Sequence, residues 1–169
     1  QLELISTYDN LWLIKSQLFH ALSTKGVARN SEESASYEKL CSEIVKIDTS
    51  KLNTEGSYLY HHTLSALYFA KGELTKSLDE LKRNLNLISD SNNPLKIEVN
   101  KHVSLLTNAI YISDKIGASK ESIGYLASLK QVANEVDSNN DLAIKLFSSI
   151  SSIELSMYLQ KGDFAKAQE

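Results

Sequence analysis

The sequence has little of the residues that break helices or cross-link chains. Its 169 residues include one proline, six glycines and one cysteine. So few breakers favour long helices over many short strands. The lone cysteine, Cys41, excludes an internal disulfide and a cysteine zinc cluster. This cysteine usage fits a reducing compartment, and we expect a cytoplasmic protein, although a cysteine-poor periplasmic domain would have the same composition.

The sequence also lacks long apolar runs and an excess of charge of one sign. No uninterrupted run of about 18 apolar residues occurs, so we expect no membrane contact by this segment. The formal net charge is -3 and the basic residues are scattered. A nucleic-acid surface needs clustered lysine and arginine, so we expect no nucleic-acid partner.

What the sequence does contain is a ladder of four glycines, which follow one another at 46, 45 and 45 residues: Gly26, Gly72, Gly117 and Gly162. Five residues after each glycine stands a small residue, namely Ser31, Ser77, Ser122 or Ala167. A glycine can end a helix in a left-handed cap at no steric cost, and a small residue one turn later lets a returning helix approach closely.

Each unit of the ladder therefore predicts a helical hairpin. We expect first helices at roughly 2–24, 54–71, 94–116 and 140–161, and second helices at roughly 31–48, 74–89, 119–137 and from 163 onward. The predicted fold is all-α: an α-α superhelix, or solenoid, of about four antiparallel helical hairpins. The repeats cover roughly 1–48, 54–89, 94–137 and 140–169 of a single domain, 1–169.

Local signals support these helix ends. Asn30 followed by Glu33 predicts a capping pair at the start of a second helix. Asn93 and Pro94 predict a helix start, with asparagine as the cap and proline at the first helical position. The last helix stops at Glu169 in the middle of its pattern, so we expect the parent protein to continue.

Two of the units resemble tetratricopeptide (TPR) repeats. The residues that carry the resemblance are Tyr68, Gly72 and Ser77 in one unit, and Tyr158, Gly162-Asp163-Phe164 and Ala167 in the other. The whole chain is similar to an internal segment of long, uncharacterised bacterial TPR-like proteins. The resemblance implies a helical solenoid that binds proteins, and it implies no reaction. The 45-residue step is longer than the usual TPR unit, so each helix should be longer by about a turn.

No residue pattern in the sequence predicts catalysis, a cofactor or a metal site. None of the histidines forms a His-x-x-x-His pair, and adjacent His61 and His62 point about 100 degrees apart on a helix. Cys41 lies on the apolar stripe of a second helix and is predicted to be a buried structural thiol. We therefore expect no enzyme activity, no cofactor and no metal.

The best candidate site is a surface. In TPR proteins the first helices line a concave wall, at positions three, six and ten residues before the glycine. By this resemblance, and with one flanking lysine, the partner-binding candidates are His20, His62, Phe69, Thr107, Tyr111, Asp114, Lys115 and Leu159. Aromatic side chains there suit a peptide ligand, and the alternative is that Phe69 and Tyr111 pack against neighbouring repeats.

The leading functional hypothesis is a protein-binding or peptide-binding scaffold. The alternative is a sensory or regulatory TPR region of a bacterial signalling protein, such as a transcription regulator or a histidine kinase. Co-chaperone function is not expected, because the lysine and asparagine clamp of chaperone-binding TPR domains is absent from the corresponding positions. The oligomeric state stays open.

Overall fold

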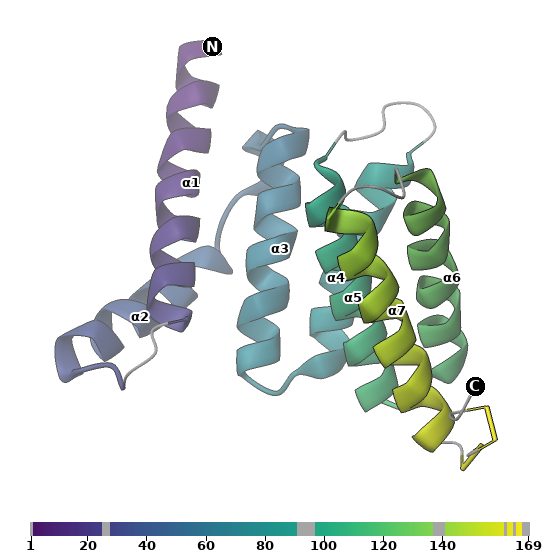
Figure 1. The fold of residues 1–169 in the computed structure, drawn as a ribbon. Coiled ribbons are helices and arrows are strands. Elements are labelled where there is room, and N and C mark those ends of the chain that lie inside the picture. The colour runs from purple at the N-terminus through teal and green to yellow at the C-terminus, as the bar shows by residue number, and fades with distance from the viewer. Residues whose placement is uncertain are drawn as a thin grey trace. The chain divides into compact units, whose positions relative to one another are not determined.

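A computed structural model describes residues 2–24, 28–90, 97–136, 141–160, 162–163 and 165–166, with side chains from residue 12 onward. Every regular element among these residues is helical, which confirms the all-α prediction. The elements are α1 (Leu2–Ser23), α2 (Ser31–Ile44), the short 3-10 helix η1 (Thr49–Lys51), α3 (Thr54–Ala70), α4 (Leu74–Ser89), α5 (Val99–Lys115), α6 (Ser119–Glu135) and α7 (Asp141–Gln160) (Figure 1). The chain divides into two compact units, Gln1–Lys96 and Ile97–Glu169.

In the first unit, α3 has helical neighbours on two sides. It pairs with α4 as the second helix of its hairpin and also packs against α1, which in turn contacts α2. Trp12 of α1 and Tyr60 of α3 are both buried, with ring centroids 5.7 Å apart. Beside them, the hydroxyls of Ser16 and Thr63 form a buried hydrogen bond of 2.8 Å. Burying these aromatic rings and apolar side chains holds α1 and α3 together.

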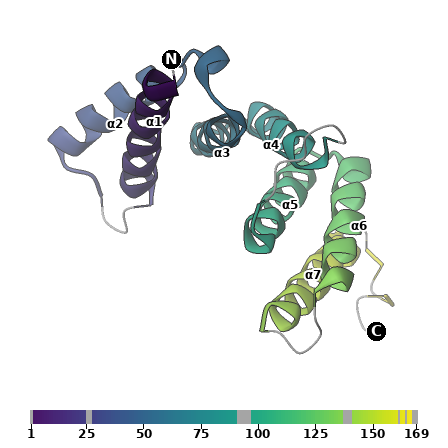
Figure 2. The ribbon, with the colours of Figure 1, turned by 90° about the horizontal axis from the view of Figure 1, so that it is seen from above.

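In the second unit, α5 and α6 form a hairpin and α7 packs against α6 (Figure 2). The core of the hairpin comes from α5, where Leu105, Leu106 and Ile110 are buried, and from α6, where Leu126 and Leu129 are buried. These positions repeat at the three- and four-residue spacing that places side chains on one helix face.

The predicted glycine caps are present at three of the four positions. Gly72, Gly117 and Gly162 have φ of 75°, 74° and 71°, and no other described residue has a positive φ. At Gly72 and Gly117 the following N–H donates to the carbonyl five residues back, Glu73 to Tyr68 at 2.9 Å and Ala118 to Ser113 at 2.8 Å. This is the Schellman pattern that ends a helix and reverses the chain. Gly26 lies outside the described residues.

Several helix ends differ from the prediction. The second helix of the first hairpin ends at Ile44 rather than near residue 48, and Asp48 instead caps η1 by accepting a hydrogen bond from the Ser50 N–H. The predicted start at Asn93 and Pro94 lies outside the described residues, but the helix expected from 94 begins only at Val99, because Glu98 is still extended.

Among the described residues after Gly162 no helix is observed, since Asp163 is not helical and Ala165 and Lys166 lie in a turn. One or two helical turns are not stable without packing, because nucleation of a helix is costly. The capping box at Asn30 and Glu33 is confirmed, with both of its hydrogen bonds at 2.9 Å.

Gly72 and Gly124 should respond in opposite directions to alanine. A Cβ at either position would meet no heavy atom within 4 Å, so only the backbone decides. Gly72→Ala forces a left-handed alanine and should lower the free energy of unfolding by about 1 kcal/mol, and Gly72→Val by more. Gly124 lies inside α6, so Gly124→Ala should raise it by about 0.5–1 kcal/mol. Urea unfolding followed by circular dichroism measures both changes, and an unchanged midpoint for Gly72→Val would refute the cap.

The small residue five positions after the glycine is buried in both hairpins, as predicted, but its hydroxyl has two different environments. Ser77 donates to the Ser65 carbonyl at 2.8 Å and contacts the Ser65 hydroxyl at 3.0 Å. Its counterpart Ser122 is fully buried, and its hydroxyl has no hydrogen-bond partner among the described residues. Ser77 therefore links α3 to α4 through hydrogen bonds. The small size of Ser122 allows α5 and α6 to approach closely, without such a bond among the described residues.

This difference predicts unequal effects of removing the hydroxyl. Ser77→Ala breaks a buried hydrogen bond and leaves Ser65 groups unpaired, so it should cost about 1 kcal/mol of stability. Ser122→Ala removes a hydroxyl that makes no bond, so its effect should be about zero or slightly stabilising. Urea unfolding of the two single variants compares them directly, and equal losses would contradict the assignment.

Candidate functional site

Four of the predicted partner-binding residues lie in the second unit, and a hydrogen bond links Asp114 to Gln160, the residue that follows Leu159. Tyr111, Asp114 and Lys115 lie near the end of α5, and Leu159 lies near the end of α7. The Lys115 ammonium sits 4.8 Å from the centroid of the Tyr111 ring. The Asp114 carboxylate accepts a hydrogen bond of 2.9 Å from the Gln160 side chain, which ties the two helix ends together. We call these five residues the α5–α7 patch.

The α5–α7 patch combines exposed apolar surface with charges of both signs. The side chains of Tyr111 and Leu159 are each 48% exposed. Large apolar side chains at this level of exposure leave surface that a partner can bury, and tyrosine is enriched among residues that dominate protein interfaces. Asp114 and Lys115 beside them can orient a ligand through hydrogen bonds and ion pairs.

Phe69 and Thr107 have different surroundings. Phe69 of α3 is 42% exposed and belongs to the first unit. Thr107 of α5 is half-buried, and its hydroxyl donates to the Val103 carbonyl of its own helix at 2.8 Å. Thr107 therefore uses its donor inside α5, and its methyl group is what remains for contact.

His20 of α1 and His62 of α3 face each other inside the first unit. Their ring centroids are 5.3 Å apart, and the Tyr58 ring stacks near His62 at 6.2 Å. Both histidines are half-buried, and the buried His20 Nε2 has no hydrogen-bond partner among the described residues. Burial lowers the pKa of His20. Burial, and then the charge of His20, lower the pKa of His62.

This histidine pair should make the first unit sensitive to acid. A histidine whose pKa is lower in the folded state than its usual 6.5 binds fewer protons there than in the unfolded chain. The free energy of unfolding should therefore be independent of this pair above pH 6.5 and fall as the pH drops below it. Fluorescence of Trp12, the one tryptophan, reports unfolding of the first unit in urea at each pH.

The variant that tests this is His20→Gln with His62→Gln, in which the loss of stability between pH 7 and 5.5 should be smaller than in wild type. The matched control is His102→Gln in the second unit, where burial also lowers the histidine pKa while Glu135 opposes the shift. That control should leave unchanged the pH dependence of the unfolding free energy that Trp12 fluorescence reports. An identical pH dependence in the double variant and in wild type would contradict the role of the pair.

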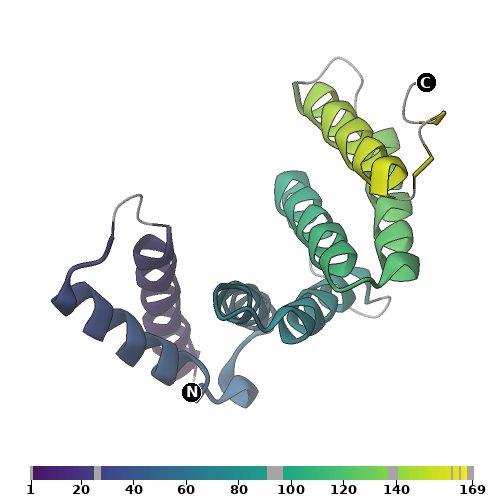
Figure 3. The same cartoon turned by 90° about the horizontal axis from the view of Figure 1, so that it is seen from below.

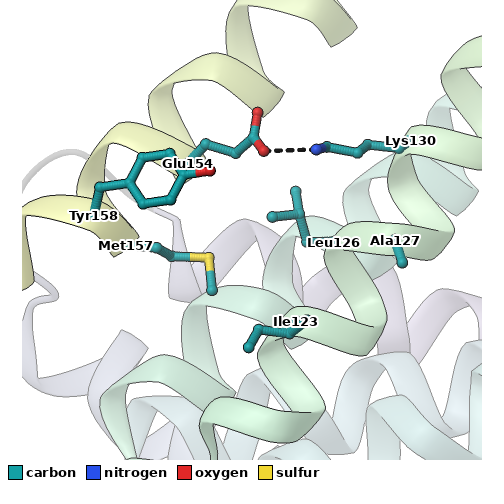
Figure 4. Close-up of a pocket in the computed structure, with 7 residues that line it drawn as sticks. All are labelled: Ile123, Leu126, Ala127, Lys130, Glu154, Met157 and Tyr158. Carbon is teal, nitrogen blue, oxygen red and sulfur yellow. Dashed lines mark hydrogen bonds and ion pairs between the residues drawn. The ribbon is translucent and has the colours of Figure 1, made fainter. Parts of the chain in front are cut away.

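A pocket of about 280 Å³ lies between α6 and α7, and the sequence patterns did not predict it. Figure 4 shows its lining, in which Ile123, Leu126 and Met157 provide apolar surface. Lys130 of α6 donates to Glu154 of α7 at 2.6 Å across it. The apolar periodicity of a single helix could not reveal this pairing, because the two residues are 24 positions apart on different helices.

A second polar cluster that the sequence did not reveal joins α3 to α4. The His61 Nδ1 lies 2.6 Å from a carboxylate oxygen of Glu80, and the other oxygen of Glu80 lies 3.2 Å from the Arg83 guanidinium. The Glu80 side chain is only 8% exposed and His61 is largely buried beside it, whereas the side chain of Arg83 is 60% exposed. The two adjacent histidines thus have different neighbours: His61 contacts Glu80 of α4, and His62 lies against His20 of α1.

The remaining chemical groups are placed as follows. Cys41 is buried in the core beside Ile44, as predicted, and burial raises the pKa of its thiol. No three histidine, cysteine, aspartate or glutamate side chains converge on a metal-sized space within the described part of the chain. Of the described helices, α7 alone is long and apolar enough to cross a membrane, a property that apolar helices of water-soluble proteins share.

Comparison with known proteins adds no assignment: no family model, no curated protein and no solved structure matches this chain. The functional argument therefore depends on the geometry described above.

Proposed function

We propose that this chain is a protein-binding or peptide-binding scaffold without catalytic activity of its own. The proposal includes a TPR-like α-α superhelix of about four hairpins and a cytoplasmic location. The observation that carries it is the α5–α7 patch, where Tyr111 and Leu159 are exposed beside Asp114 and Lys115. A site of this composition can bind a ligand but has no activated nucleophile or acid–base pair.

The expected ligand is a short peptide segment with one large apolar side chain. That side chain would cover Tyr111 and Leu159, while neighbouring charges of the peptide meet Asp114 and Lys115. Phe69, which is 42% exposed, lies three residues before Gly72 and so occupies the same repeat position as Leu159. This supports the idea that first helices present variable surface residues.

Selection from a random peptide library on the immobilised chain tests this proposal. Peptides that bind wild type should bind Tyr111→Ser with Leu159→Ser at least about tenfold more weakly, because central apolar contacts each contribute more than about 1 kcal/mol. The matched control is Ile14→Ser with Val45→Ser, which removes two other exposed apolar side chains from the first unit. Failure to select any peptide, or selected peptides that bind both double variants equally, would contradict the proposal.

A further inference from the structure

Helices α6 and α7 lie side by side in the second unit (Figure 3), and a pocket of about 280 Å³ remains between them. Close-packed protein interiors leave few voids larger than a water molecule, which takes about 30 Å³ in the liquid. Leu126 of α6 and Met157 of α7 form the floor of the pocket, since each is only 8% exposed. The pocket therefore has room for a ligand on an apolar floor.

The α6 side of the pocket is open because of a small residue. Ala127 lines the pocket and is exposed, and its methyl group fills little of the space. Ile123, one turn earlier, is 48% exposed, so it lies where the pocket opens to solvent. Concave sites for small molecules have mostly apolar linings and volumes of roughly 300–1,000 Å³. A pocket near the lower end of this range suits a ligand of the size of one amino acid.

The opposite end of the pocket is polar. Lys130 and Glu154 form an ion pair of 2.6 Å there, and Figure 4 shows this pair across the lining from Ile123. Their side chains are 48% and 28% exposed. Ion pairs at this level of exposure contribute little to stability, so separating the two groups costs little free energy. Once separated, they offer an ammonium and a carboxylate side by side.

A ligand that enters between Lys130 and Glu154 has to satisfy both charges. A carboxylate alone would pair with Lys130 but lie against Glu154 as a like charge, and an amine alone would do the reverse. A free α-amino acid carries a carboxylate and an ammonium on the same carbon, so it can pair with both groups. Its side chain would then extend over Leu126 and Met157.

Met157 and Tyr158 of α7 determine which side chains fit. A thioether is flexible and polarisable, so it adapts to ligands of irregular shape and makes favourable contacts with aromatic rings. The half-buried ring of Tyr158 lines the same wall and adds apolar surface. Neither side chain offers a charge to the ligand, so this wall favours uncharged apolar side chains such as those of leucine and phenylalanine.

We propose that the pocket between α6 and α7 binds a free α-amino acid with an apolar side chain, whose carboxylate pairs with Lys130 and whose ammonium pairs with Glu154. None of the five residues of the α5–α7 patch lines this pocket, so the inference does not rest on the proposed function. The bound amino acid contacts both helices, and its binding therefore stabilises their packing.

Met157 provides a direct probe, because it is the one methionine of the chain and lines the pocket. The full chain is labelled with carbon-13 in the methionine methyl group and titrated with L-leucine and with L-phenylalanine. The single methyl signal should shift and saturate with a dissociation constant of about 1 mM or lower, an affinity that ligands of this size reach. Two analogues of leucine, 4-methylpentanoate without the ammonium and N-acetyl-leucinamide without either charge, should bind at least about tenfold more weakly.

Two variants locate the binding. Ala127→Phe fills the pocket from an exposed position and should abolish the response to leucine, whereas the matched control Ser128→Phe changes the next residue, which is exposed and outside the lining, and should keep it. Lys130→Gln with Glu154→Gln keeps the cavity but removes both charges, and should weaken leucine binding about tenfold. Circular dichroism shows whether each variant folds, and the charge variant tests the proposal even if Ala127→Phe does not.

Three results would each overturn the proposal. The first is the absence of a saturable shift with both amino acids. The second is binding of N-acetyl-leucinamide as tight as that of leucine, because this analogue mimics an internal residue of a protein, and the pocket would then accept a side chain of a protein partner. The third is unchanged leucine binding in folded Ala127→Phe or in the charge variant.

Discussion

The left-handed glycine turn is the constraint on which each hairpin depends. At Gly72, Gly117 and Gly162 the backbone adopts φ near 70° to 75°, a conformation that costs other residues about 1–2 kcal/mol. The turn ends one helix and sets the position at which the returning helix begins. Because α4 and α6 start two residues after Gly72 and Gly117, equivalent positions of the two helices keep the same spacing from the turn. Ser77 and Ser122 are buried for this reason.

Counting back from the glycine distinguishes two faces of each first helix, which contact different parts of the structure. Five residues before the glycine stand Leu67, Ile112 and Met157, which are apolar and buried in all three helices. That face belongs to the core, and its chemistry varies little. Seven and eleven residues before the glycine lies the face for the second helix, where the contacts are polar in α3 and apolar in α5. The pairing of two helices can therefore use either hydrogen bonds or apolar packing.

The sequence predicted the repeat, the helix type and the glycine caps because these depend on local chemistry and on spacing. It misplaced the end of α2 and the start of α5, because no local signal showed that Asp48 would cap a separate turn or that Glu98 would stay outside the helix. It also missed contacts between helices, such as His61 with Glu80 and Lys130 with Glu154. Those pairs depend on how side chains meet across a hairpin, which periodicity along one helix does not encode.

The position three residues before the glycine is not needed for packing and is therefore available for binding. It holds Phe69, Asp114 and Leu159, and none of the three is buried. Residue type there ranges from aromatic to acidic without any loss of the hairpin, so the fold does not dictate it. A position that the fold leaves unconstrained can change with the ligand, whereas the buried residue two positions earlier cannot. The proposed scaffold function thus belongs to the face that the hairpins do not use.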